Sequence, residues 1–200
     1  MRNFSTDTGR LEAFSDGVLA VIITIMVLEL RPPRSDTLYS FSHVLPSIAL
    51  YALSFVFIGI YWNNHHHMLR ASKGINGPAM WANLHLLFWL SLVPFATSWL
   101  GQNPRAVGPT ALYSFVLLMD SLAYALLQRT LLYVNGKATP FAKAVAIDVK
   151  GKLSIVLYVL AVAAAFVSTI ASDVILVAVA VMWLVPDRRF EPLINRNEEM

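Results

Sequence analysis

The stretch from Arg10 to Leu30, RLEAFSDGVLAVIITIMVLEL, decides the fold class of this chain. Polar residues occupy its first turns, and a single threonine, Thr24, then interrupts an apolar run over positions 18–28. A helix on the surface of a soluble protein shows polar residues at every turn. This helix is therefore expected to lie in lipid or among other helices, and about 20 residues suffice to cross roughly 30 Å of hydrocarbon.

The composition of the whole chain indicates an integral membrane protein. Of its 200 residues 57% are hydrophobic and 14% charged, whereas soluble domains carry about 25% charged residues. Cysteine is absent, which excludes disulfides and thiolate metal sites. The net charge of +3 is typical of a membrane orientation signal rather than of nucleic-acid binding, and no cleavable signal peptide is expected.

Apolar runs long enough to cross a bilayer recur along the chain and predict an all-α protein with six transmembrane helices in one domain, 1–200. The predicted spans are about 10–30, 42–66, 79–100, 108–133, 152–171 and 172–186, followed by a short tail, 187–200. The last two spans divide one continuous apolar tract at Ser172 and Asp173. Loops with Pro or Gly separate the others, as in Gly74–Pro78, Gly101–Pro104 and Asn135-Gly136.

The basic residues predict the orientation of these spans. Twelve of the fifteen Lys and Arg residues fall on the side that holds both termini, and Arg31, Arg34 and Arg105 fall on the other. Because basic residues accumulate on the cytoplasmic side of membrane proteins, both termini are expected to be cytoplasmic.

Two polar groups stand out at the cytoplasmic ends of the first two spans. Asp16 lies inside the first span, where an ionisable residue indicates function unless water at the interface reaches it. The second span ends in Tyr61-Trp62-Asn63-Asn64-His65-His66-His67. Consecutive residues on a helix point in different directions, so the spacing argues against a metal or haem site. The histidines are better explained as hydrogen-bond partners of Asp16 and Arg10, or as ordinary interface residues.

One stripe of the first helix carries Val21, Ile25 and Leu28, with Gly17 one turn before it and Thr24 on its flank. Ordinary helix packing explains this spacing as well as a functional surface does. Glu29 ends the stripe and could attract cations or be merely solvated. Structural contacts between helices explain the other polar residues within the spans as well as function does: Asn83, His85, Ser91, Thr97, Asp120 and Ser121. Pro94 is expected to kink the third span.

Two motifs resemble a known family. Arg10-x-x-x-Phe14-Ser15-Asp16-Gly17, followed by an apolar helix, resembles the first-helix signature of the transmembrane protein 175-like potassium channels. Tyr61-Trp62-x-Asn64-His65-His66 is similar to the end of their second helix. The chain also matches the bacterial branch of that family, with its single six-span repeat, in length and number of spans.

The resemblance implies a homotetramer in which the first helices line a central pore without a TVGYG filter. It assigns Val21, Ile25 and Leu28 to the apolar constrictions, with Thr24 facing or flanking the path. Val21 departs from the bulkier residue common there, which implies a wider constriction. A network that holds the pore helices would comprise seven residues: Arg10, Ser15, Asp16, Trp62, Asn64, His65 and His66.

The expected function is therefore a potassium-permeable cation channel in the bacterial inner membrane. It is not expected to be an enzyme or to bind a cofactor, metal or nucleic acid, and potassium is the permeant species. A secondary transporter that uses Asp16 and the His65–His67 cluster is the alternative, although no inverted repeat is evident. A purely structural membrane protein also fits the composition.

Overall fold

The computed structural model describes residues 8–33, 35–136 and 139–185, and over these ranges it is built from helices alone. The helices are, in chain order, α1 (Thr8–Leu28), α2 (Leu38–Ser42), α3 (Leu45–Ala71), α4 (Gly77–Leu90), α5 (Val93–Gln102), α6 (Val107–Asn135), α7 (Pro140–Ala146), α8 (Val149–Ala165) and α9 (Thr169–Leu184).

Four helical segments of the described chain are long and apolar enough to cross a membrane: α1, α3, the joined α4–α5 (Gly77–Gln102) and α6. The apolar helix α9 is shorter, and α8 has 17 residues. With these two, the number of long helical segments fits the six expected. The short helices α2 and α7 lie in connections for which the sequence predicted no helix.

Local residue chemistry explains where several helices begin and end. Asn76 caps α4 by accepting a hydrogen bond from the backbone of Ala79 at 3.0 Å. The long helix α6 ends at Asn135 because Gly136 adopts a φ of 84°, a conformation that favours glycine. The predicted breaks near Pro78 and at Asn135-Gly136 are therefore found.

The boundary between the last two long helices differs from the predicted one. The chain turns at 166–168, and Ser168 caps α9 by accepting from the backbone of Ala171 at 3.3 Å. Ser172 lies inside α9, is fully buried, and bonds Ser114 of α6 at 3.0 Å. The break expected at Ser172 and Asp173 was wrong because the serine that caps the helix precedes them by one turn.

The third segment bends as its proline predicted. α4 ends at Leu90 and α5 begins at Val93, with Pro94 in the first turn of α5. The hydroxyl of Ser91 donates to the carbonyl of Phe88 at 2.7 Å. This bond satisfies a carbonyl at the end of α4 where the regular helix stops.

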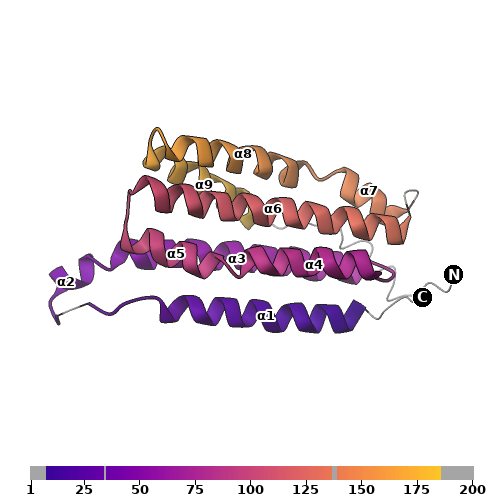
Figure 1. Ribbon diagram of the computed structural model, residues 1–200, viewed down its shortest axis with the longest axis horizontal. Helices are drawn as coiled ribbons and strands as arrows, with labels where there is room; N and C mark the ends of the chain where they lie inside the picture. The colour runs from indigo at the N-terminus through magenta and orange to yellow at the C-terminus, as the bar shows by residue number, and fades with distance from the viewer. Residues whose placement is uncertain (1–7, 34, 137–138, 186–200) are drawn as a thin grey trace.

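The long helices run along one bundle axis in alternating directions (Figure 1). α1 lies at one edge and packs on α3, α4 and α5, while α6 lies deeper and packs on α4, α5, α8 and α9. Large buried side chains such as Phe57, Leu86, Tyr113 and Leu127 form the core between the layers.

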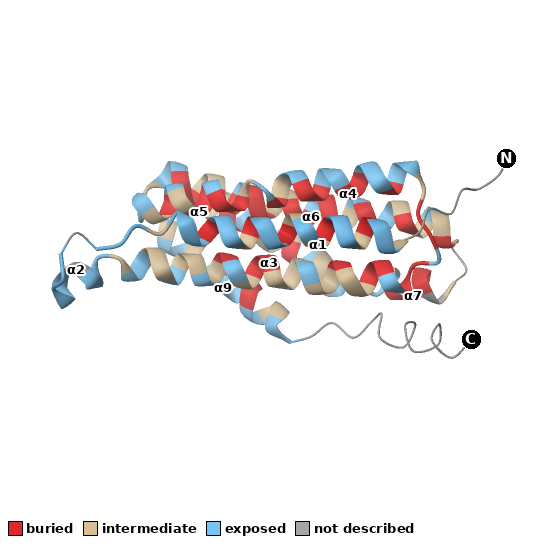
Figure 2. Ribbon diagram, turned by 90° about the horizontal axis from the view of Figure 1, so that it is seen from below, coloured by how far each residue is buried: buried red, intermediate tan, exposed pale blue. Residues whose placement is uncertain are grey.

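This arrangement leaves one side of α1 uncovered. Figure 2 shows α1 across the front of the bundle with much of its outward side exposed. The end of the bundle that holds Thr8 is called the Thr8 end below, and the opposite one the Leu28 end.

Candidate functional site

Helix α1 has two faces that differ in burial rather than in polarity. Its bundle-facing side buries Leu11, Ser15, Leu19, Ile22 and Met26, which follow one another at intervals of three or four residues. Apolar side chains also cover most of the opposite side. A helix with this pattern is apolar all round in its middle and needs lipid or further protein against its open face.

The predicted pore stripe lies on this open face. Val21 is 55% exposed, Ile25 43% and Leu28 80%, and Gly17 is exposed as well. Thr24 is exposed too, and its hydroxyl donates back to the carbonyls of Ala20 at 3.0 Å and Val21 at 2.9 Å. These bonds commit its proton to the backbone, so that only lone pairs of the hydroxyl oxygen are available outward.

A groove of about 720 Å³ runs beside the stripe, between α1 and the bend that joins α4 to α5. Gly17, Val21 and Ile25 form one wall, while Pro94 and Phe95 form the other. The groove exists because α4 and α5 bend at the point where they pass α1. It widens the open apolar surface from a single helix face to a face shared with α5.

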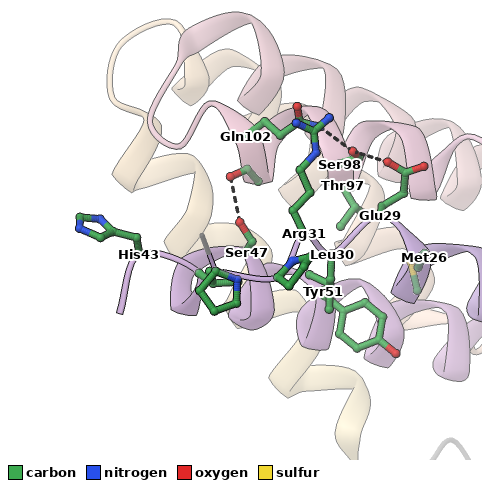
Figure 3. A pocket seen from close by; sticks show the side chains of 14 residues that line it. Met26, Glu29, Leu30, Arg31, His43, Ser47, Tyr51, Thr97, Ser98 and Gln102 are labelled. Atoms are coloured by element: carbon green, nitrogen blue, oxygen red, sulfur yellow. Dashed lines mark hydrogen bonds between the residues drawn. The ribbon is translucent and has the colours of Figure 1, made fainter. Parts of the chain in front are cut away.

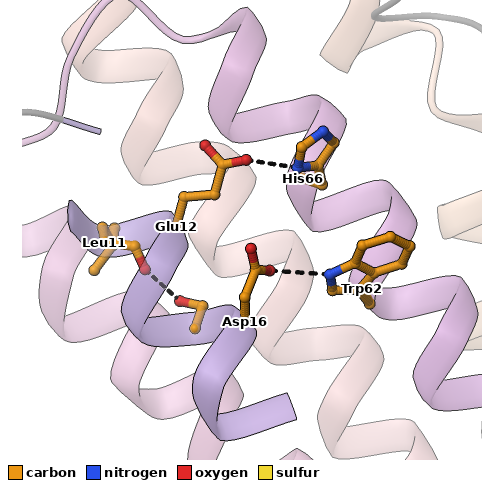
Figure 4. Close-up of polar contacts among 6 residues, drawn as sticks. Leu11, Glu12, Asp16, Trp62 and His66 are labelled. Atoms are coloured by element: carbon orange, nitrogen blue, oxygen red, sulfur yellow. Dashed lines mark hydrogen bonds and ion pairs between the residues drawn. The ribbon is translucent and has the colours of Figure 1, made fainter. Parts of the chain in front are cut away.

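Carboxylates at the Thr8 end of α1 reach the end of α3 (Figure 4). The indole nitrogen of Trp62 donates to Oδ1 of Asp16 at 3.0 Å. One turn away, Nδ1 of His66 lies 2.5 Å from Oε1 of Glu12, which is an ion pair when the imidazole is protonated. The rings of Trp62 and His66 stack with centroids 6.0 Å apart. Two carboxylates one turn apart on α1 therefore meet two rings one turn apart on α3.

A buried chain of hydrogen bonds lies behind these contacts and ties three helices together. Nδ2 of Asn83 on α4 donates to the hydroxyl of Ser15 at 2.9 Å, and its Oδ1 lies 2.7 Å from Nε2 of His65 on α3. The Ser15 hydroxyl donates in turn to the carbonyl of Leu11 at 2.8 Å. Ser15, Asn83 and His65 are at most 1% exposed. Polar groups buried this deeply are stable only when they are bonded.

These two sets of contacts are called the polar anchor below. Its members are Glu12, Ser15, Asp16, Trp62, His65, His66 and Asn83. The anchor fixes the rotation of α1 about its own axis, because residues on two neighbouring faces of the helix are both bonded to the bundle. The open face of α1 is thereby fixed in direction too.

The structure brings together most of the network residues that the sequence predicted, but not all of them. Arg10 is exposed and forms no ion pair with a residue in the described part of the chain. The Asn64 side chain bonds the carbonyl of Ile60 in its own helix at 2.9 Å. His66 contacts Glu12 rather than Asp16 or Arg10.

Asn83 is the member whose role the sequence did not identify. The sequence explained it equally well by a structural contact or by function, and in the structure it links α1 to His65. A signal was present, because an amide in the apolar run of the third span needs a partner. The sequence could not show which helix supplies that partner.

The three consecutive histidines do not converge on one point. His65 bonds Asn83, His66 contacts Glu12, and Nδ1 of His67 has no hydrogen-bond partner among the described residues. Within the described ranges, no group of three or more His, Cys, Asp or Glu residues lies close enough to hold a metal ion.

Polar residues further along the bundle join helices inside the subunit. The Ser54 hydroxyl of α3 lies 2.8 Å from that of Thr97 on α5 and 2.8 Å from the phenol oxygen of Tyr113 on α6. Asp120 on α6 is fully buried, and its carboxylate oxygens have no hydrogen-bond partner in the described chain. None of these residues lines the groove beside α1.

Known proteins are similar to this chain in sequence and fold. A family model described as the endosomal/lysosomal potassium channel TMEM175 matches residues 10–94, which include the polar anchor and all of α1 except its first two residues. A potassium channel of Chryseobacterium sp. (strain P1-3) is 45% identical over 189 residues, which are 94% of this chain and 98% of that protein. A potassium channel of Streptomyces collinus is 36% identical over 59% of this chain and 61% of its own length.

The fold has a solved counterpart. The crystal structure of a lysosomal potassium-selective channel TMEM175 homolog from Chamaesiphon minutus matches with a TM-score of 0.79 and 28% identity, over 89% of this chain and 96% of that one. A potassium channel is not an enzyme, and the family does not favour the secondary transporter alternative. The chain is a multi-pass membrane protein that belongs to the TMEM175 family of potassium channels.

Proposed function

We propose that four copies of this chain form a potassium-permeable channel in which the α1 helices surround a central pore. The observation that carries the proposal is the open apolar face of α1 combined with the polar anchor behind it. A single chain offers one such helix at the edge of its bundle, so a closed pore requires several copies around a symmetry axis.

Lipid alone could cover an open apolar face, and the residues of α1 favour a protein partner instead. The outward side of α1 carries three small residues within about two turns: Gly17, Ala20 and Thr24. Small residues let helices approach closely in membranes. A fixed rotation, as the polar anchor provides, matters only where a particular face must meet a particular partner.

In the proposed pore each level of the stripe becomes a ring of four equal side chains. Val21, Ile25 and Leu28 lie successive turns apart, so they supply three apolar rings along the axis. An apolar ring too narrow for a hydrated ion loses its water and so blocks conduction. A slightly wider ring lets the ion pass only after the ion has lost part of its hydration shell. Potassium loses water more easily than sodium, so these rings favour potassium. The chain contains no TVGYG sequence that could form a carbonyl filter.

The orientation follows from the charges at the two ends of the bundle. Most of the described basic side chains lie toward the Thr8 end: Arg10, Arg70, Lys73, Arg129, Lys143, Lys150 and Lys152. Arg31 and Arg105 lie toward the Leu28 end. We place the Thr8 end and both termini in the cytoplasm of a bacterial cell and the chain in its inner membrane.

Ion flux through purified protein in liposomes tests this function. Under an outward potassium gradient the vesicles are expected to take up a cationic dye or release potassium, and single channels in a bilayer are expected to show unitary steps.

Ile25→Asn wets the middle ring and should raise flux while reducing the preference for potassium over sodium. Val174→Asn likewise replaces an exposed branched side chain by an amide, on the outward side of α9, and should leave flux and selectivity unchanged. Absence of potassium flux in the unmutated protein would contradict the proposal.

A further inference from the structure

Glu29 continues the pore stripe beyond the last turn of α1. It follows Leu28 directly, and its backbone N–H donates to the carbonyl of Met26 at 3.3 Å. It lines the same groove as Val21 and Ile25, which puts it on that side of α1. It is the acidic residue at the Leu28 end of a face that is otherwise apolar.

The carboxylate of Glu29 is exposed and yet held in place. The hydroxyl of Ser98 on α5 donates to its Oε2 at 2.8 Å, and Nε2 of Gln102 donates to the Ser98 hydroxyl at 2.9 Å (Figure 3). Ser98 and Gln102 lie one turn apart on one face of α5. This relay orients the carboxylate without neutralising it, since no Lys or Arg of the described chain pairs with Glu29.

Glu29 lies where two hollows of the surface meet. A pocket of about 360 Å³ opens at the Leu28 end, and the groove of about 720 Å³ runs along the pore stripe. Glu29 and Ser98 line both of them, whereas Arg31 and His43 line only the pocket. Glu29 therefore lies at the junction of the pocket and the groove, on the side of the pore stripe.

The field at this position favours cations. The carbonyl end of a helix carries a partial negative charge, and the end of α1 adds to the full charge of Glu29. Four copies around an axis multiply both contributions, and fixed charges of one sign at a mouth raise the local concentration of counter-ions. Arg31 opposes this field from the pocket, but the relay holds the carboxylate on the side of the groove as well.

We infer that Glu29 determines conductance by concentrating cations at the outer mouth of the pore, and that Ser98 and Gln102 position its carboxylate. The inference rests on the proposed channel function and extends it to a residue outside the apolar rings. It makes conduction from the outer side dependent on one acidic group and on ionic strength, because salt screens exposed charges.

Single-channel recording from excised patches of known orientation tests the inference. Glu29→Gln keeps the size and the hydrogen bond from Ser98 while removing the charge. At about 10 mM KCl, where the Debye length is roughly 30 Å, inward unitary current should fall about twofold or more, and at 1 M, where that length is about 3 Å, the difference should disappear. Asp36→Asn removes an equal charge from an exposed loop at the same end and should change the low-salt current by less than half as much. Ser98→Ala keeps the charge of Glu29 but removes the hydrogen bond that holds its carboxylate in place. The low-salt current of this variant should lie between those of the wild type and Glu29→Gln.

The outcomes separate three statements, namely the role of Glu29, the positioning role of the relay, and the channel function. Equal low-salt currents for Glu29→Gln and the wild type, or equal losses for Glu29→Gln and Asp36→Asn, would overturn the role of Glu29. A Ser98→Ala current equal to that of the wild type would overturn the positioning role of the relay. Wild-type patches without potassium current would instead overturn the channel function on which the inference depends.

Discussion

At the scale of single residues, Asn83 is the member of the polar anchor that links α1 to α3 from a third helix, α4. Its amide donates to Ser15 of α1, and its carbonyl oxygen faces Nε2 of His65 on α3. All three side chains are buried. A buried polar group that loses its partner pays the full cost of leaving water. Truncating Asn83 removes the partner of Nε2 of His65 and one of the two hydrogen bonds of the Ser15 hydroxyl, which still donates to the carbonyl of Leu11.

Asn83→Ala is therefore expected to lower the free energy of unfolding by about 1–3 kcal/mol. The matched control is Asn64→Ala, which removes a side-chain bond to the same helix only and should cost less than about 0.5 kcal/mol. Thermal unfolding of both variants in one detergent measures the difference. An Asn64→Ala variant as destabilised as Asn83→Ala would contradict the assignment of the anchor.

Some contacts of the anchor could be expected before the structure was known, and others depend on how the helices pack. Asp16 and Trp62 fall in one network only through the family resemblance, because the topology alone suggests the histidines as partners of Asp16. Arg10 could not be excluded, since its exposure depends on how α1 rotates. Asn64 and Asn83 both looked like candidates, and only the packing of α4 against α1 and α3 decides which of them is shared between helices.

At the scale of elements, α1 presents a face that the rest of the described subunit does not cover. A Cβ atom added at Gly17 would meet no other atom within 4 Å. The isolated subunit therefore gives no reason for glycine at this position, where it weakens a helix by about 1 kcal/mol relative to alanine. Close approach to other copies around a pore supplies such a reason.

Gly17→Leu is accordingly expected to leave the subunit folded while potassium flux falls to a small fraction of the wild-type value, because four bulky groups enter the pore. Gly59→Leu on α3 is the control, since a Cβ there also meets nothing within 4 Å. Helix content by circular dichroism and flux in liposomes separate folding from conduction. Unchanged flux in Gly17→Leu, or equal loss in both variants, would contradict the pore assignment of this face.

The long helices could be predicted because each needs a long apolar run, and the breaks with Pro or Gly had a local cause. The chain reversal between α8 and α9 could not be placed correctly, since Ser168 and Ser172 look alike in sequence and differ only in what they bond. Ser168 caps a helix, whereas Ser172 bonds Ser114 across the bundle. Helices α2 and α7 are short, so they lack the periodic signal that longer helices give.

At the scale of the whole molecule, one chain forms a bundle with its own core, and α1 lies at an edge of this bundle with its outward side uncovered by the other described helices (Figure 1). The proposal completes that edge with three further copies. Native mass spectrometry of the purified protein in detergent should therefore give particles of four 22.2-kDa chains. Monomers or dimers as the sole species, in detergent that preserves flux on reconstitution, would contradict the tetramer.

The measurement that tests the central claim most directly is block of potassium current through a thiol placed on α1. The chain has no cysteine, so Leu28→Cys introduces a single reactive group at the most exposed position of the stripe. If the α1 helices line the pore, a charged, membrane-impermeant thiol reagent on the outer side will reduce the current of Leu28→Cys and leave that of Val174→Cys on α9 unchanged. A Leu28→Cys current that persists after complete labelling, as judged by mass spectrometry, would contradict the claim that α1 faces the ion path.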